Sequence, residues 1–316
     1  MKNQCIYCKS NNLSFVDNYK FEIDDDVKFL GNMKIFECNS CQIVFTLPMP
    51  ELNKLNYFYE NIYRKYSRPH FYNKFYKKNS YLYDINLEYI SYLTSNINFE
   101  KINTLLDFGA GLGNIGYALK KKFKHLQIYS LESDENCQDI LRERGYKNYK
   151  NLDDINIKFD LIISLHVFEH LTNINLIKQL TNFINVNGYF FFEVPNADFK
   201  EGYNSRVFDS PHLIFFNNNN IRNIFDKFDL YKISLLNTSY DINHDIENQI
   251  LSKNKSNGKT IYSKIVLYLK KYEPYILQNI RIRLNLFKNL LSEDRLKWYF
   301  NGNKKGRCIR GLYKKK

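Results

Sequence analysis

The chain has 316 residues with 46 basic and 33 acidic side chains, which gives a formal net charge of +13. A hydrophobic content of 44%, with 16% aromatic residues, excludes a disordered chain and is enough to bury a core. No run approaches the roughly 18 apolar residues that a membrane span needs. The first residues also lack the apolar stretch of a secretory signal, so we expect a cytoplasmic protein of about two domains.

Two pairs of cysteines stand near the N-terminus, each with CxxC spacing. Two strand-like runs between them, Leu13 to Phe21 and Val27 to Phe36, predict a hairpin that brings the pairs together. Four thiolates suit tetrahedral Zn²⁺ in a closed structural site, whereas the alternatives are redox pairs or incidental thiols. The predicted ligands are Cys5, Cys8, Cys38 and Cys41.

A connector rich in tyrosine follows the cysteines. Tyrosine offers both a packing face and a hydroxyl group, which suits a lid over a polar ligand. The alternative is an amphipathic helix that uses tyrosine as core. A further helix is predicted from Ser80 to about Asn96. The connector residues expected to reach over a ligand are Tyr59, Tyr63, Tyr66 and His70.

From residue 102 the pattern alternates between strands and helices, which predicts an α/β domain with a mostly parallel sheet. Seven strands are expected, at Ile102 to Phe108, Gln127 to Glu132, Asn148 to Tyr149, Phe159 to Leu165, Gly188 to Val194, Leu230 to Leu236 and Arg307 to Lys314. The helices between them are expected at Asn114 to Phe123, Glu135 to Arg144, Asn173 to Asn185 and Asn217 to Phe228.

The turn after the first of these strands is glycine-rich and runs into a helix. Its glycines fit a dinucleotide-binding GxGxxG pattern, and Glu132 after the next strand could serve a nucleotide ribose. Asp107, two residues before the first glycine, favours another ligand. A carboxylate would repel a pyrophosphate there, but it can bind the ammonium group of a methionyl moiety.

The segment Asp107 to Gly113 resembles the DxGxGxG motif of class I S-adenosylmethionine (SAM)-dependent methyltransferases. Further segments resemble this family in the same order: Glu132, Leu152 to Asp154, Phe159 to Leu171, Phe192 to Asn196 and Ser210 to Phe216. The resemblance implies a Rossmann-like, seven-stranded, mostly parallel sheet with helices on both faces. It also implies that SAM is bound by Asp107, Gly109, Gly111, Gly113, Glu132, Leu152 and Asp153.

Together with the cysteine pairs, the chain looks most like zinc-containing methyltransferases of bacterial deoxysugar and surface-polysaccharide pathways. A small-molecule acceptor is therefore expected, an activated sugar or glycan precursor, with O-methylation favoured. Sugar C-methyltransferases carry a Tyr-x-Glu-His element of which this chain keeps only His212. The implied organisation is a zinc module (1–47), a connector (48–100), a methyltransferase core (101–240), a basic helical insertion (241–300) and a final strand (301–316).

Methyl transfer to a hydroxyl group needs a base with a pKa near 7, for which histidine is the obvious residue type. His166, just after the strand that ends at Leu165, is the first candidate and His212 the second. Glu169 and Asn196 are expected to contact the acceptor. Alternative functions are a zinc-ribbon RNA methyltransferase, a sugar C- or N-methyltransferase, an NAD-dependent sugar enzyme and a non-catalytic cofactor-binding scaffold.

The positive charge is concentrated at the C-terminus, where residues 251–316 carry 18 basic and 3 acidic side chains. Codon bias of an AT-rich genome explains part of the lysine excess, so we discount the charge as evidence for nucleic acid. Apolar and basic residues interleave from Ile261 to Phe300, which predicts helices that pack on the body or on a second subunit. Five cations could instead attract an activated sugar or an anionic membrane surface: Lys270, Lys271, Arg281, Arg283 and Lys288.

Overall fold

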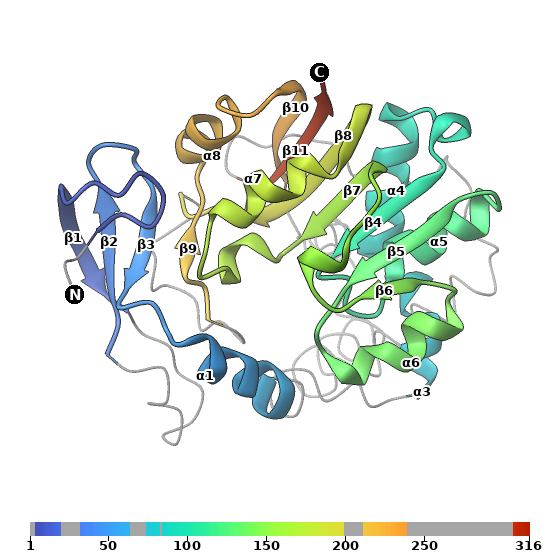
Figure 1. Ribbon diagram of the computed structural model, residues 1–316, viewed down its shortest axis with the longest axis horizontal. Helices are drawn as coiled ribbons and strands as arrows, with labels where there is room; N and C mark the ends of the chain where they lie inside the picture. Colours follow the sequence, from blue (N-terminus) through green and yellow to red (C-terminus); the bar gives the residue numbers. More distant parts are fainter. Residues whose placement is uncertain (1–3, 20–31, 64–73, 83, 199–210, 239–305) are drawn as a thin grey trace, which may run out of the picture.

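The computed structural model describes residues 4–19, 32–63, 74–82, 84–198, 211–238 and 306–316 (Figure 1). Within these residues the chain forms one seven-stranded and one four-stranded sheet. The expected basic insertion, including the five cations named above, lies outside the described residues, and so do Tyr66 and His70. Among the described residues, no helix combines the length and the apolar character needed to cross a membrane.

The large sheet has the strand order β10-β11-β8-β7-β4-β5-β6. Neighbouring strands from β8 to β6 are parallel, whereas β11 is antiparallel to both β8 and β10. This arrangement confirms the predicted seven-stranded, mostly parallel, Rossmann-like sheet. Its strands are β4 (Thr104–Phe108), β5 (Gln127–Leu131), β6 (Lys147–Tyr149), β7 (Phe159–Leu165), β8 (Ile184–Pro195), β10 (Leu230–Thr238) and β11 (Cys308–Lys315).

Helices cover both faces of the large sheet (Figure 1). One face packs against α4 (Asp84–Asn96), α5 (Asn114–Lys122) and α6 (Glu135–Glu143), and the other against α7 (Asn175–Asn182) and α8 (Asn218–Phe225). Side chains alternate along β8, so Phe191 joins the first core and its two neighbours join the second. Burial on both faces explains the nearly continuous apolar sequence of the central strands.

Two boundaries on this side of the domain differ from the expectation. The helix predicted to end at Asn185 ends at Asn182, and β8 begins at Ile184 rather than Gly188. The strand extends backwards because Ile184 is fully buried against the second core and pairs with Phe159. In contrast, α8 begins as predicted, because the side chain of Asn217 accepts hydrogen bonds from the backbone of the first turn.

The hairpin predicted between the two cysteine pairs is present, and it forms part of a four-stranded antiparallel sheet in the N-terminal module. This sheet contains β1 (Leu13–Asn18), β2 (Lys34–Cys38), β3 (Val44–Leu47) and, at one edge, β9 (Ile214–Phe215). The strand β9 comes from the part of the chain that forms the large sheet, just before α8, and it pairs with Val44 and Phe45. The small sheet therefore lies beside α8 and joins the large domain through hydrogen bonds (Figure 1).

The connector between the two sheets is helical where the structure describes it. Its elements are α1 (Leu52–Tyr57), the π-helical turn η2 (Phe58–Tyr63), α3 (Lys74–Asn79) and the single turn η4 (Ser80–Leu82). The helix expected from Ser80 thus starts with a turn of 3₁₀ helix and continues as α4. A second short turn, η5 (Phe99–Lys101), leads into β4, an interior strand of the large sheet.

Candidate active site and metal centre

The glycine loop lies between β4 and α5, at the carboxyl edge of the large sheet. Its backbone φ angles are +71° at Gly109, +55° at Gly111 and +67° at Gly113. Side chains with a Cβ atom rarely adopt this left-handed conformation, so glycine is required at all three positions. The loop can therefore turn tightly and bring its backbone close to a ligand at the start of α5.

Arg144 and Tyr146, which the sequence analysis did not identify, form hydrogen bonds to the glycine loop and its flanking residues. The buried guanidinium of Arg144 donates to the carbonyl of Leu112 and, at 2.7 Å, to the side-chain oxygen of Asn114. The hydroxyl of Tyr146 lies 3.0 Å from the carbonyl of Gly113. Both side chains follow α6 and lie far from the loop in the sequence, so no local motif could have identified them.

Asp107 is buried at the end of β4, beneath this loop. The hydroxyl of Tyr146 donates to its carboxyl oxygen over 3.1 Å. Burial raises the pKa of Asp107 to about 7, and the nearby charge of Glu132 adds to this effect, while the hydrogen bond from Tyr146 opposes it. The carboxyl group therefore gains or loses its proton near neutral pH, and a cation placed beside it would favour the charged form.

Glu132 follows β5 and lies against the same loop. Its carboxylate accepts hydrogen bonds from the backbone N–H of Gly111 at 2.6 Å and of Asp134 at 2.8 Å. The side chain is partly exposed, so its oxygens remain close to any ligand in the loop. Leu152 and Asp153 lie on the turn η6 (Leu152–Asp154) after β6, where Leu152 packs on the core and Asp153 is exposed.

His166 is the first residue after β7. Its φ angle of 56° is left-handed, which is uncommon for a residue other than glycine. The backbone N–H of His166 donates to the carbonyl of Glu193 on the neighbouring strand β8, which fixes this turn. Strained backbone of this kind is concentrated at functional sites in proteins, where the surrounding structure holds it in place.

The imidazole of His166 lies between two buried carboxylates. Its Nδ1 atom is 3.4 Å from Glu169 on the turn η7 (Phe168–His170), and its Nε2 atom is 3.4 Å from Glu193. The side chain of His166 is 29% exposed, whereas both glutamates are almost completely buried. This arrangement orients the ring from both sides and leaves it accessible at the carboxyl edge of the sheet.

Glu193 belongs to a buried network that extends beneath the site. One carboxylate oxygen accepts from the hydroxyl of Tyr89 at 2.5 Å, and the other accepts from Arg310 at 2.7 Å and from Thr238 at 3.1 Å. Arg310 also forms an ion pair with Glu88. Burial alone would favour the neutral form of Glu193, but Arg310 and His166 outweigh this effect and lower its pKa.

His170 and His212 lie on the other side of Glu169. The rings of the two histidines are 5.0 Å apart between centroids, and the ring of Tyr59 lies 6.0 Å from that of His170. Burial disfavours the charged form of Glu169, but His170 and the other histidines outweigh it and lower its pKa to about 2. The structure thus brings together both predicted bases, Glu169 and one connector tyrosine.

The remaining predicted acceptor-binding residues are placed differently. Asn196 is buried, and its amide donates to the carbonyl of Gly306 while its side-chain oxygen accepts from the backbone of Asp198. These bonds connect the end of β8 to the segment before β11, which is a structural role. The backbone of Tyr63 lies at the end of η2.

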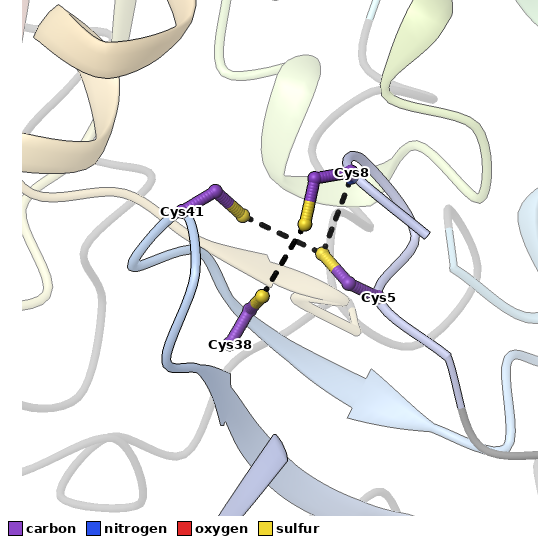
Figure 2. A group of neighbouring side chains, drawn as sticks. All are labelled: Cys5, Cys8, Cys38 and Cys41. Atoms are coloured by element: carbon purple, nitrogen blue, oxygen red, sulfur yellow. Dashed lines mark hydrogen bonds between the residues drawn. The ribbon is translucent and has the colours of Figure 1, made fainter. Parts of the chain in front are cut away.

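The four N-terminal cysteines converge in space (Figure 2). The Sγ atoms of Cys5 and Cys41 are 3.5 Å apart, as are those of Cys8 and Cys38, and all four lie within 4.8 Å of one another. None of them is in a disulfide. With zinc–sulfur bonds of about 2.3 Å, the sulfurs of a tetrahedral site are separated by comparable distances.

The two CxxC turns have the same backbone structure. In each turn, the N–H of the residue after the second cysteine donates to the carbonyl of the first cysteine, at 3.1 Å for Lys9 and 2.7 Å for Gln42. Both of these residues have a positive φ angle. The N–H groups of Tyr7 and Cys8 also point at the sulfur of Cys5, which suits a thiolate. The residues present therefore fit a structural Zn²⁺ ion.

A parallel sheet with a left-handed glycine loop after its central strand and an acidic residue after the next strand is characteristic of SAM-dependent methyltransferases. Sequence comparison gives the same result. The profile of the Methyltransf_23 family, described as a methyltransferase domain, matches residues 77–235, half of the chain. The chain belongs to this family and is a SAM-dependent methyltransferase. No curated protein shows a significant sequence match to it.

Three solved methyltransferase structures are similar to this chain at low sequence identity. The plantazolicin methyltransferase BpumL with SAH is 14% identical, with 83% of this chain and 94% of that chain covered and a TM-score of 0.47. An O-methyltransferase from a trans-AT polyketide synthase of Brevibacillus brevis, also with SAH, is 15% identical (81% and 79% covered, TM-score 0.46). Coclaurine N-methyltransferase is 15% identical (73% and 72% covered, TM-score 0.45).

Proposed function

We propose that the protein transfers the methyl group of SAM to a hydroxyl oxygen of a nucleotide-linked sugar or related small precursor of a bacterial surface glycan. His166 is the general base in this proposal. The observation that supports it best is the position of the imidazole between the carboxylates of Glu169 and Glu193. The sugar part of the proposal rests on the resemblance of the cysteine module and connector to methyltransferases of glycan pathways.

The contact between Val167 and Gly109 supports a position of His166 close to the transferred methyl group. A Cβ atom on Gly109 would lie 2.4 Å from Cγ2 of Val167, so the turn after β7 packs directly on the glycine loop. In the proposal SAM lies over Gly109, Gly111 and Gly113, with its ribose at Glu132 and its ammonium group near Asp107. The base then adjoins the cofactor on the side that Glu169 and His170 line.

The chemistry requires alignment and removal of one proton. The acceptor oxygen attacks the methyl carbon in line with the departing sulfur, and the sulfonium leaves as a neutral thioether. The hydroxyl proton passes to the imidazole of His166, and the resulting cation is stabilised by the two adjacent carboxylates. Glu193 is held in its charged form by Arg310, which keeps this stabilisation available.

The proposal is tested by incubating the purified chain with SAM labelled in its methyl group and a panel of nucleotide sugars, lipid-linked glycans and RNA. Mass spectrometry then identifies the labelled product and the modified atom. With the substrate that is found, His166→Gln should lower kcat by about 10²–10⁴-fold and leave the affinity for SAM unchanged. His125→Gln is a matched control, because His125 contacts the carbonyl of Phe99 outside the site.

Three results would contradict the proposal. Label found in RNA alone would show that the substrate class is wrong. Label on a carbon or nitrogen atom of the acceptor would show that the reaction is not O-methylation. Full activity of His166→Gln at saturating acceptor would assign proton removal to another group, and His212→Gln is then the next variant to measure.

A further inference from the structure

Glu169, His170 and His212 form a second group of candidate metal ligands, separate from the four cysteines. One ligand atom of each residue lies within 4.8 Å of the others. Two of the residues come from η7 and the third from the segment before β9. The backbone N–H of Leu213 donates to the carbonyl of Glu169 over 2.7 Å, so the two segments are held together independently of the side chains.

The carboxylate of Glu169 is not satisfied by the protein around it. The side chain is 2% exposed, and its Oε2 atom is buried without a hydrogen-bond partner. The polar contacts of the other oxygen, Oε1, within the described residues are to histidine nitrogens, at 3.4 Å from His166 and 3.7 Å from His170. A buried carboxylate oxygen without a donor is costly, and such an oxygen is a good ligand for a cation.

His170 presents a lone pair to this carboxylate. Its Nδ1 atom is 2.8 Å from the carbonyl oxygen of Pro211, which can only accept, so Nδ1 carries the proton of the neutral ring. Nε2 is then an acceptor and faces Glu169 Oε1 at 3.7 Å. A cation between these two atoms, either a proton on the ring or a metal ion, would satisfy both of them. Metal-binding histidines commonly donate their other N–H to a backbone carbonyl in this way.

The neighbouring group of His166, Glu193 and Cys308 provides a contrast. Its ligand atoms are equally close together. However, both oxygens of Glu193 already accept hydrogen bonds, and the guanidinium of Arg310 supplies the compensating charge. Both carboxylate oxygens of Glu193 therefore have donors within the protein, whereas Oε2 of Glu169 has none.

We propose that Glu169, His170 and His212 bind one first-row divalent metal ion beside His166. Two imidazoles and one carboxylate are a ligand set that suits ions such as Zn²⁺, Fe²⁺ or Co²⁺, and three protein ligands leave positions open for an exogenous oxygen. The role of the ion rests on the proposed function. An acceptor hydroxyl bound to it would become more acidic, and His166 would remove its proton.

The site is tested by titrating Co²⁺ into the full-length, zinc-loaded protein and recording its absorption spectrum. Cobalt at the cysteines gives strong thiolate-to-metal charge-transfer bands, whereas the site of two histidines and one glutamate gives only weak ligand-field bands. We expect one equivalent of Co²⁺ to bind with ligand-field bands alone. Glu169→Gln, which keeps the shape of the side chain, and His212→Ala should each weaken this binding by at least about tenfold.

His125→Ala serves as the control for loss of a histidine outside the site and should leave the titration unchanged. Circular dichroism of each variant establishes that it is folded. The proposal is overturned if zinc-loaded protein binds no Co²⁺, if binding always brings thiolate bands, or if folded Glu169→Gln and His212→Ala bind as tightly as wild type. None of these measurements depends on turnover. The metal-site proposal can therefore be refuted while the proposed reaction stands, and the proposed reaction can be refuted while the metal site stands.

Discussion

Val167 and Gly109 pack against each other across the carboxyl ends of β7 and β4, in a contact that has no room for a methyl group. A Cβ atom on Gly109 would lie 2.4 Å from Val167 Cγ2, closer than carbon atoms approach in proteins, and the φ angle of +71° is itself unfavourable for alanine. This contact couples the cofactor loop to the turn that carries His166.

Gly109→Ala should therefore displace either the loop or the turn and weaken SAM binding by at least about tenfold, since left-handed strain alone costs roughly 1–2 kcal/mol. Isothermal titration calorimetry measures the change. Gly145→Ala is the matched control, because its φ angle is +78° but the nearest atom to its Cβ lies at 3.7 Å, on Lys120. Equal affinities for SAM in the two variants would show that the contact with Val167 is unimportant.

SAM binding should release protons near neutral pH if the methionyl ammonium lies near Asp107. Burial raises the pKa of Asp107 to about 7 in the free protein, so the group is partly protonated there. A cation lowers this pKa, the proton leaves, and the affinity for SAM rises with pH through this range. Calorimetry in buffers of different ionisation enthalpy counts the protons. Asp107→Asn should remove the protons that Asp107 releases on SAM binding. An unchanged number of released protons in this variant would place the ammonium group elsewhere.

Loss of one cysteine of the N-terminal cluster should cost one equivalent of zinc per chain and destabilise the small sheet. Cys8→Ser is the appropriate change, because Cys8 is the exposed member and its replacement leaves no cavity. Metal binding contributes directly to folding free energy at such sites, so the melting temperature should fall. Cys137→Ser changes a buried cysteine outside the cluster and should retain all the zinc by elemental analysis. Undiminished zinc in Cys8→Ser would rule out the four-cysteine site.

The stability of the protein should depend on pH through Glu88. Burial raises the pKa of this carboxyl group from 4.5 to about 7, with a further contribution from Glu193, although Arg310 opposes the shift. A pKa that is higher in the folded state means that stability decreases as pH rises from the unfolded value to the folded one. In Glu88→Gln the free energy of unfolding should fall less between pH 4.5 and 7, and the difference from the wild type should be roughly 3 kcal/mol at most.

Urea unfolding at several pH values measures this slope. Glu143→Gln, on the exposed side of α6, is the control and should leave the slope unchanged. If Glu88→Gln lowers the free energy of unfolding by the same amount at every pH, the change reflects only the lost ion pair with Arg310. A pH dependence equal to that of the wild type would exclude the Glu88 carboxyl group as the origin of the slope.

Sequence reasoning succeeded where a local pattern carries the information. The strand Phe159–Leu165 and the start of α8 were predicted at the observed residues, because an apolar run and an asparagine cap are local signals. The glycine loop is equally local, since three closely spaced positions require a positive φ angle.

Contacts between distant segments were beyond such reasoning. The strand β9 has two residues and gains its partners from β3, so neither its length nor its sequence distinguishes it from a loop. In the candidate site, His166 and Glu169 were predicted from the sequence, and the structure places them next to each other. Arg310, which neutralises Glu193, lies on β11 and approaches it only because β11 pairs with β8.

The sharing of β9 between the two parts of the molecule also constrains the order in which the chain can fold during synthesis. Val44 and Phe45 leave the ribosome long before Ile214 and Phe215, so the edge of β3 is without its partner while most of the large domain is being made. An open strand edge can pair with another chain, and β9 closes this one. The strands β1 to β3 precede the large sheet in the chain but β9 follows β8, so completion of the small sheet depends on synthesis of the large sheet through β8.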